Sequence, residues 1–345
     1  MTVPEAMIAI VILWVFIFIY SIVGSIDFGA GFWSMLYGKH KGTRAGELAN
    51  RFLSPAWKVT NVFLVLLVVA LVGFFPHATY TLGSLLIVPV SLVLILLTIR
   101  STFMVYAYSV DRFRGTLRIV SGVTGLFIPA LLISLLPVTL GGFLNVNGES
   151  VSLRFADLLQ SPTLYAHLGF GLTTELYLSA LFLADYAKVA GDSSSYQTYR
   201  RLAVAFGPST LGFAVLTTWT MVPEASWIVE AIIDHGFWFG LSVAAFVLAY
   251  ASLWIQGRDG EKGLPRVAVV GTVIQYGLAS YAYGASHMPY ILYPMLTVEE
   301  GFTNPAMFRS LLYGYTIGAA LLIPAFIMFW RLFLQDKSYA NPEAD

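Results

Sequence analysis

Two carboxyl groups, Asp27 and Glu175, lie deep inside long apolar stretches of this 345-residue sequence, and they are its strongest candidates for chemistry. A carboxylate inside a membrane is costly unless it is paired, protonated or hydrated, so such residues often carry protons or bind ions. The alternative is a neutral acid whose hydrogen bonds only stabilise helix packing. The sequence alone leaves a functional role and a structural role open for each of these two acids.

The neighbours of Asp27 favour proton transfer. Helical spacing places Tyr20, Gly24 and Gly31 on the same side of the helix as Asp27. Glycines at such positions allow another helix to approach closely. Asp27 also lies toward the end of its segment that we place at the cytoplasm, so we expect it to relay protons inward.

Glu175 has Gly171 and Ser179 one helical turn away on its own side. It lies deeper in its segment than Asp27 does, and the sequence indicates no route for water. A proton-carrying role and a structural role therefore both remain open for Glu175.

Two basic residues lie within apolar segments near their cytoplasmic ends. Long basic side chains at such positions can extend to the membrane surface while their methylene groups stay among apolar neighbours. This behaviour explains Lys58 and Arg100. An ion pair with a carboxylate is the alternative for Lys58, and Pro129 is interpreted as the cause of a kink.

The sequence has five histidines, which could bear on haem binding. Haem in a helical bundle requires two facing histidines, or one histidine and another axial ligand. His167 and His287 could meet near the outer surface, but hydrogen bonding at that surface explains them better. We therefore expect no haem or metal site in this chain.

The composition predicts that a membrane surrounds most of the chain. Hydrophobic residues make up 58% of the sequence and charged residues only 11%, whereas about a quarter of the residues of soluble proteins are charged. The net charge of zero gives no reason to expect a nucleic-acid partner. Because cysteine is absent, disulfides, thiolate metal sites and cysteine nucleophiles are excluded.

About 20 apolar residues are needed for a helix to cross the hydrocarbon core of a membrane. The sequence predicts nine such helices, at residues 6–36, 56–75, 79–108, 118–138, 162–188, 201–222, 237–256, 265–285 and 308–333. The first is too long, and too poor in preceding basic residues, for a cleaved signal peptide. We expect an all-α polytopic protein with one integral-membrane domain over residues 1–345 and no strands.

The distribution of basic residues predicts the orientation. Of the nineteen Lys and Arg residues, Arg154 and Arg309 fall on one set of alternate loops, and Lys58 lies just inside the second segment. The others fall on the opposite set, at its helix ends or in the C-terminal tail. The positive-inside rule then places the N-terminus outside and the C-terminus in the cytoplasm.

The nine segments suggest two four-helix bundles plus one extra helix. The sub-bundles would span residues 1–140 and 160–286, and the last helix residues 308–334. Residues 227–234 have apolar residues at helical spacing, which predicts a short helix at the outer interface or one that packs on the loops. The two embedded acids and this pseudo-repeat also suggest an alternative function, that of a secondary transporter.

Several motifs resemble subunit II of the cytochrome bd-type quinol oxidases, and the resemblance runs nearly from end to end. Gly24-Ser-Ile-Asp27-Phe-Gly29-Ala-Gly31 is similar to the Asp-Gly-Phe-Asp-Leu-Gly-x-Gly signature of the family. The second aspartate is kept as Asp27, and Gly24 replaces the first. Pro55-Ala-Trp57 is similar to the entry of the second span, where Lys58 replaces an acid, so a proton role of that acid does not carry over.

Three later motifs agree in order and spacing. Arg100 matches the arginine of the third-span Arg-Pro motif, although Ser101 replaces the proline. Gly125-Leu-Phe-Ile-Pro129 is similar to the fourth-span pattern. The turn with Pro289 and Pro294 is similar to the family turn before the last span.

The resemblance implies a haemless subunit in a prokaryotic cell membrane. Its partner would be a larger subunit I with two b-type haems and haem d, and the complex would oxidise quinol, reduce dioxygen to water and generate a proton gradient. This chain would act as a scaffold and as the cytoplasmic proton entrance. The resemblance leaves open a small single-span accessory subunit and a bound quinone or lipid.

Overall fold

Long helices coincide with all nine apolar segments in the computed structural model, which describes residues 4–38, 44–107, 114–147, 150–257, 260–329 and 331. These helices are α1 (Pro4–Tyr37), α2 (Ala45–Phe74), α4 (Ile87–Ala107), α5 (Arg114–Ile133), α8 (Pro162–Val189), α9 (Ser193–Glu224), α11 (Gly236–Ala251), α12 (Pro265–His287) and α14 (Pro305–Phe329). The all-α membrane fold is therefore confirmed.

The number of membrane crossings stays a prediction. Among the described residues, six helical segments are long and apolar enough to cross a membrane; they lie in α1, α2, α4, α5 with α6, α9 and α14. A seventh crossing results if α10 and α11, which meet at an angle of 74°, form one broken span. Because α8 and α12 are not in this group, the count of nine crossings is not settled by length and composition.

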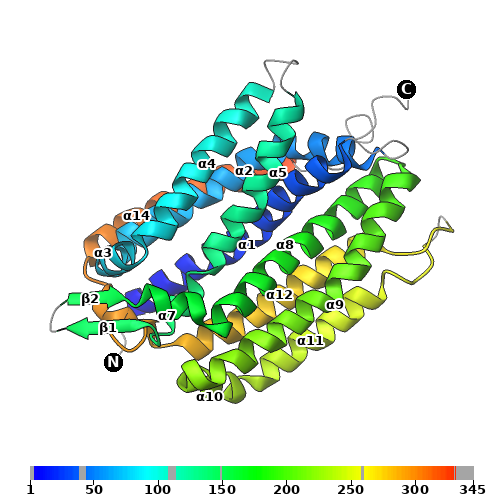
Figure 1. Cartoon of the computed structure of the whole chain (residues 1–345). Helices are drawn as coiled ribbons and strands as arrows, with labels where there is room; N and C mark the ends of the chain where they lie inside the picture. The colour runs from blue at the N-terminus through cyan, green and yellow to red at the C-terminus, as the bar shows by residue number, and fades with distance from the viewer. Residues whose placement is uncertain are drawn as a thin grey trace.

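The long helices run side by side in two neighbouring groups (Figure 1). Helices α1, α2, α4 and α5 pack together, as do α8, α9, α11 and α12, and α1 packs against α8. Helix α14 lies beside α2, and its apolar stretch has no buried residue in this chain. The division into the two sub-bundles of the sequence analysis remains an interpretation.

Two helix breaks have similar geometry. Helix α2 ends before Phe75 (φ −129°, ψ 61°), and the 10-residue α3 (Pro76–Leu85) follows. Helix α9 ends before Ala225 (φ −152°, ψ 61°), and the 9-residue α10 (Ser226–Asp234) follows. A third break divides the segment predicted as one helix over residues 79–108. It lies at Leu86, which leaves the helical conformation (φ −105°, ψ 18°).

The predicted short helix over residues 227–234 is present as α10. Its Ile228 is fully buried, and the helix packs against α9 and α12. These contacts agree with a helix that packs on the protein.

The prediction that the chain has no strands is wrong for the connections. Two short antiparallel hairpins join helices: β1 (Leu144–Asn147) with β2 (Ser150–Leu153), and β3 (Tyr290–Leu292) with β4 (Leu296–Thr297). The remaining short helices are α6 (Leu136–Thr139), α7 (Phe155–Gln160) and α13 (Val298–Gly301). The prediction rested on the rule that lipid-exposed backbone cannot form open sheet edges, because no water is present to satisfy them. The rule does not apply to these hairpins, because they lie in loops.

The second hairpin holds two of the motif prolines. The peptide bonds Met288–Pro289 and Tyr293–Pro294 are both cis. The Tyr293 N–H donates to the Thr139 carbonyl at 3.1 Å, and Gly141, with φ +85°, packs against the Tyr293 carbonyl. Pro289 and Pro294 therefore belong to a turn that fastens the end of α12 to the end of α6.

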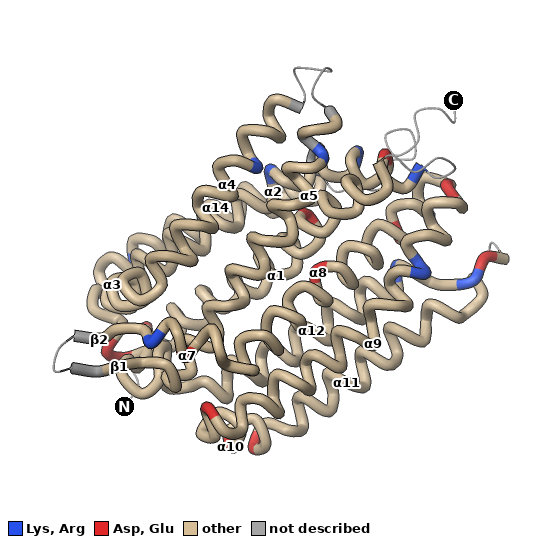
Figure 2. The backbone as a smooth tube through the Cα atoms, in the orientation of Figure 1, with Lys and Arg blue, Asp and Glu red and all other residues tan. Residues whose placement is uncertain are grey.

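Charged residues segregate along the helix axes. Figure 2 shows that most of the described Lys and Arg residues lie at the end of the bundle opposite to α3, α7 and α10. Acidic residues mark the other end at α10. The basic residues thus gather at one end of the bundle, as their segregation on alternate loops predicts. The orientation of the chain in a membrane stays a prediction.

Candidate functional site

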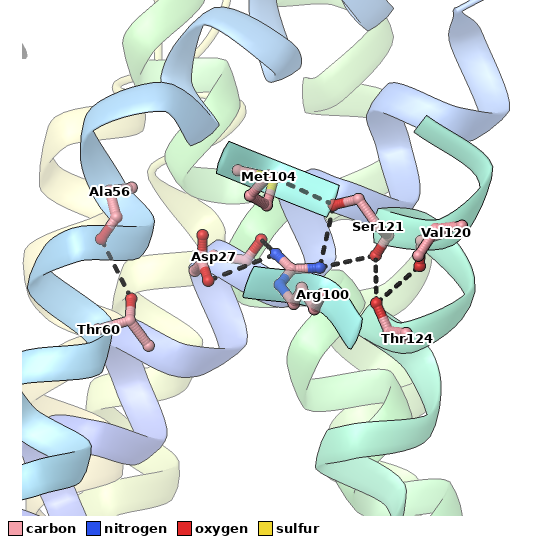
Figure 3. A network of polar contacts seen from close by, with 8 residues as sticks. All are labelled: Asp27, Ala56, Thr60, Arg100, Met104, Val120, Ser121 and Thr124. Atoms are coloured by element: carbon pink, nitrogen blue, oxygen red, sulfur yellow. Dashed lines mark hydrogen bonds and ion pairs between the residues drawn. The ribbon is translucent and has the colours of Figure 1, made fainter. Parts of the chain in front are cut away.

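A buried ion pair joins α1 to α4. Nη2 of Arg100 lies 3.4 Å from Oδ2 of Asp27 and donates to the Asp27 carbonyl at 3.2 Å. Nη1 of Arg100 donates to the carbonyl and the hydroxyl of Ser121 on α5, at 2.6 and 3.1 Å. Figure 3 shows that the guanidinium lies between Asp27 of α1 and Ser121 of α5. One arginine thus connects three helices.

The interpretation of Arg100 as a side chain that extends to the membrane surface is wrong. Arg100 is only 4% exposed and Asp27 only 2%. Arginine stays charged in proteins and offers five donors in a planar fork. The carboxylate and the carbonyl oxygens around this fork replace the water that the guanidinium would otherwise require.

Glycines make room for the guanidinium. A Cβ atom on Gly31 would lie 3.0 Å from Nη1 of Arg100, and one on Gly125 would lie 2.5 Å from the Phe28 carbonyl oxygen. The Phe28 ring centroid is 5.0 Å from Cζ of Arg100, which is a cation–π distance. The small residues of these motifs therefore serve the close packing of α1, α4 and α5 around a charge.

The spacing suggested close helix contacts at Gly24 and Gly31, and the structure has such contacts at Gly31 and at Gly29. Gly31 faces α5, and Gly29 faces α8, where its Cβ would lie 2.9 Å from the Glu175 carbonyl oxygen. The prediction is wrong for Gly24, whose nearest neighbours are the Phe28 and Tyr20 side chains of its own helix. Spacing placed all three on a helix, but only packing decides which neighbour each one faces.

A small pocket with a mixed polar and apolar lining adjoins the ion pair between α1, α2 and α4. Its lining includes Asp27, Trp57, Asn61, Arg100 and Ser101. The buried Oδ1 of Asp27 and Nε1 of Trp57 have no hydrogen-bond partner among the described residues. The pocket has room for about one water molecule, which requires polar partners of this kind.

Tyr20 and Glu175 lie on different sides of this site. The Tyr20 hydroxyl is buried without a hydrogen-bond partner among the described residues. Glu175 is fully buried on α8, and neither carboxylate oxygen has a described hydrogen-bond partner. Asp27, Trp57 and Arg100 thus line one pocket, Tyr20 lies seven residues before Asp27 on α1, and the main-chain carbonyl of Glu175 packs against Gly29.

Other predicted residues do not join the site. Lys58 is exposed, and Pro55 lies in α2 with its side chain outside the described part. Pro129 lies within α5, which continues past it to Ile133. Sequence reasoning missed Ser121 and Asn61. The signal that could have found them is a small polar residue inside an otherwise apolar segment.

Three histidines, His167, His235 and His287, lie within hydrogen-bond distance of nearby main-chain oxygens. Nδ1 of His167 lies 2.8 Å from the Thr163 carbonyl oxygen, and Nδ1 of His287 lies 2.9 Å from that of Tyr290. Nε2 of His287 lies 3.4 Å from the Thr139 hydroxyl. Within the described ranges, no three His, Asp or Glu residues form a group that could hold a metal ion.

Comparisons with known proteins agree on one family. Residues 5–333 match the family model described as cytochrome bd terminal oxidase subunit II. The chain is 45% identical over 341 residues to the putative cytochrome bd menaquinol oxidase subunit II of Bacillus subtilis (strain 168), with 98% of each chain covered. The structure is similar to a chain in the structure of bd oxidase from Geobacillus thermodenitrificans, with a TM-score of 0.83 and 36% identity, over 97% of this chain and 100% of that one. This chain, in which the signature aspartate pairs with the arginine of the third-span motif, therefore belongs to the cytochrome bd terminal oxidase subunit II family.

Proposed function

We propose that this chain is the haemless subunit of a quinol-oxidising, oxygen-reducing membrane complex, and that Asp27 is where protons enter from the cytoplasm. Family membership supports the first part. The buried Asp27–Arg100 pair beside a polar pocket is the observation that carries the second. The family match gives no support to the alternative of a secondary transporter.

The geometry suits proton uptake. Reduction of dioxygen to water consumes protons as well as electrons, so the complex needs a path for protons through its apolar interior. Asp27 lines a pocket with room for about one water molecule; its Oδ1 has no described hydrogen-bond partner, and its Oδ2 faces Arg100. A proton delivered through water can bind Oδ1, while the arginine stabilises the carboxylate once the proton has moved on.

Tyr20 is the next group along α1. It precedes Asp27 by two helical turns, and its unpaired hydroxyl can both donate and accept a hydrogen bond. We assign it the role of passing protons between Asp27 and the interior of the complex.

The haems are assigned to the partner subunit. Two b-type haems and one haem d would lie in subunit I, which would also bind the quinol, and this chain would support that subunit in the prokaryotic cell membrane. The gathering of Lys and Arg at one end of the bundle supports an outer N-terminus and a cytoplasmic C-terminus. An accessory single-span subunit and a bound quinone or lipid are compatible with this arrangement.

The test compares three variants of the assembled oxidase in liposomes. Asp27→Asn keeps the size and an acceptor for Arg100 but cannot carry a proton, so we expect turnover to fall at least about tenfold with normal haem content. Asp27→Glu should retain more activity. Asp157→Asn is the matched control, because Asp157 is an exposed aspartate that pairs with the equally exposed Arg154. Wild-type turnover and proton uptake in Asp27→Asn would place the entrance elsewhere.

A further inference from the structure

The pocket beside Asp27 has a closed side and an open side. Its lining residues on α1 are buried, as are Arg100 and Met104 of α4, and together they form the closed side. The other lining residues are half-buried and come in pairs one helical turn apart, namely Trp57 and Asn61 on α2 and Leu97 and Ser101 on α4. The pocket therefore opens between α2 and α4.

Trp57 is a motif residue to which the proposed function gives no role. Its Nε1 is buried and has no hydrogen-bond partner among the described residues, and the same is true of Oδ1 of Asp27. An indole N–H group can only donate a hydrogen bond, and a carboxylate oxygen can only accept one. Both residues line a pocket with room for about one water molecule. A single water can therefore accept from Trp57 and donate to Asp27.

The groups around the pocket favour water over an ion. Asp27 disfavours an anion there and the paired Arg100 disfavours a cation, and the two unpartnered atoms require a molecule that both accepts and donates. Water does both, and a buried water makes about three hydrogen bonds. The Asn61 amide and the Ser101 hydroxyl line the same pocket and can provide the remaining bonds.

We propose that Trp57 is a positioning residue, which holds the water that delivers a proton to Asp27, and that this water is reached from the open side of the pocket between α2 and α4. The proposal rests on the proposed role of Asp27 as the proton entrance. The water accepts a hydrogen bond from Nε1 of Trp57 and directs one of its O–H groups at Oδ1 of Asp27. It passes that proton to the carboxylate and takes another from the next water at the open side, so its own composition is unchanged.

A cryo-electron microscopy map of the assembled oxidase that resolves water molecules tests this site directly. We expect one water at about 3 Å from both Nε1 of Trp57 and Oδ1 of Asp27. Benzothienylalanine in place of Trp57 keeps the shape of the side chain but has sulfur instead of the N–H group, so the water should be lost. A direct hydrogen bond between Trp57 and Asp27, or a wild-type map without this water, would overturn the proposal.

Proton uptake in liposomes separates this positioning role from a structural one. Trp57→Phe and the benzothienylalanine variant should slow proton uptake about fivefold, which is the effect of one hydrogen bond of ordinary strength. The KM for quinol and the haem spectrum should stay as in the wild type. Trp227→Phe is the matched control, because Trp227 is also half-buried and its Nε1 donates to the Leu140 carbonyl at 3.2 Å, outside this pocket.

An uptake rate in the benzothienylalanine variant equal to that of the wild type would contradict the proposal. Turnover of Asp27→Asn decides by itself whether Asp27 is the proton entrance. The water between Trp57 and Asp27 is detected in the map whatever the outcome of that experiment, so the two proposals can fail independently.

Discussion

Arg100 reaches Asp27 across a helix interface, with 3.4 Å between Nη2 and Oδ2 and both side chains buried. The pair is incomplete on the acid side, because Oδ1 of Asp27 has no described hydrogen-bond partner. It is nearly complete on the basic side, where three further bonds go to Ser121 and to the Asp27 carbonyl. This asymmetry holds the arginine in place and leaves one carboxylate oxygen of Asp27 without a described partner, as the proposed proton uptake requires.

The first prediction concerns the arginine. Arg100→Gln should hold Asp27 in its protonated form, because a buried carboxylate without a partner costs several kcal/mol. Proton release from Asp27 would then limit the rate, and we expect turnover to fall at least about tenfold. Arg100→Lys should retain more activity, since it keeps the charge but loses the planar fork. Stopped-flow measurement of proton uptake by the assembled oxidase compares the two variants. A wild-type rate of proton uptake in Arg100→Gln would contradict the mechanism.

The second prediction concerns the pocket beside Asp27. Asn61→Leu replaces a polar lining residue with an apolar one of similar size, so water should be less stable next to Oδ1. We expect slower proton uptake with an unchanged haem spectrum. Thr60→Val is the control on the same helix, because among the described residues the Thr60 hydroxyl bonds only to the Ala56 carbonyl of its own helix, at 3.3 Å. Equal uptake rates in the two variants would exclude a role for the pocket.

The third prediction concerns the contact between α1 and α8. Gly29→Ala adds a methyl group that would meet Ser179 and the Glu175 carbonyl oxygen, the latter at 2.9 Å. Overpacking of this kind costs about 1 to 3 kcal/mol, so the yield and thermal stability of the purified complex should fall. Gly83→Ala in α3 meets nothing within 4 Å and serves as the control. Equal melting temperatures for the two variants would show that the helices can move apart freely.

The fourth prediction concerns haem. Single substitutions of His77, His167, His235 and His287 should leave every haem band of the assembled oxidase in place. The Nδ1 atoms of His167, His235 and His287 each lie within 2.9 Å of a main-chain oxygen, which agrees with a role in hydrogen bonding. Visible spectra of the purified complexes provide the measurement. Loss of one band in a variant that assembles fully would place an axial ligand in this chain.

The sequence by itself determined the helical membrane fold, because apolar stretches of sufficient length can satisfy their backbone in lipid only as helices or closed barrels. It also singled out Asp27 and Glu175, since an acid inside such a stretch stands out without any knowledge of its neighbours. The family signature further connected Asp27 and Arg100 to one protein class, although nothing in their spacing indicated that they touch.

Only the tertiary structure decided which residues meet. Asp27 and Arg100 are separated by 73 positions in the chain, and the rotation of α4 against α1 determines whether the arginine points to the membrane surface or to the acid. The same holds for Ser121, whose carbonyl oxygen became a partner of Arg100, and for Gly24, whose nearest neighbours are side chains of its own helix. Local sequence patterns set the faces of a helix, but the packing of one helix on another sets what each face contacts.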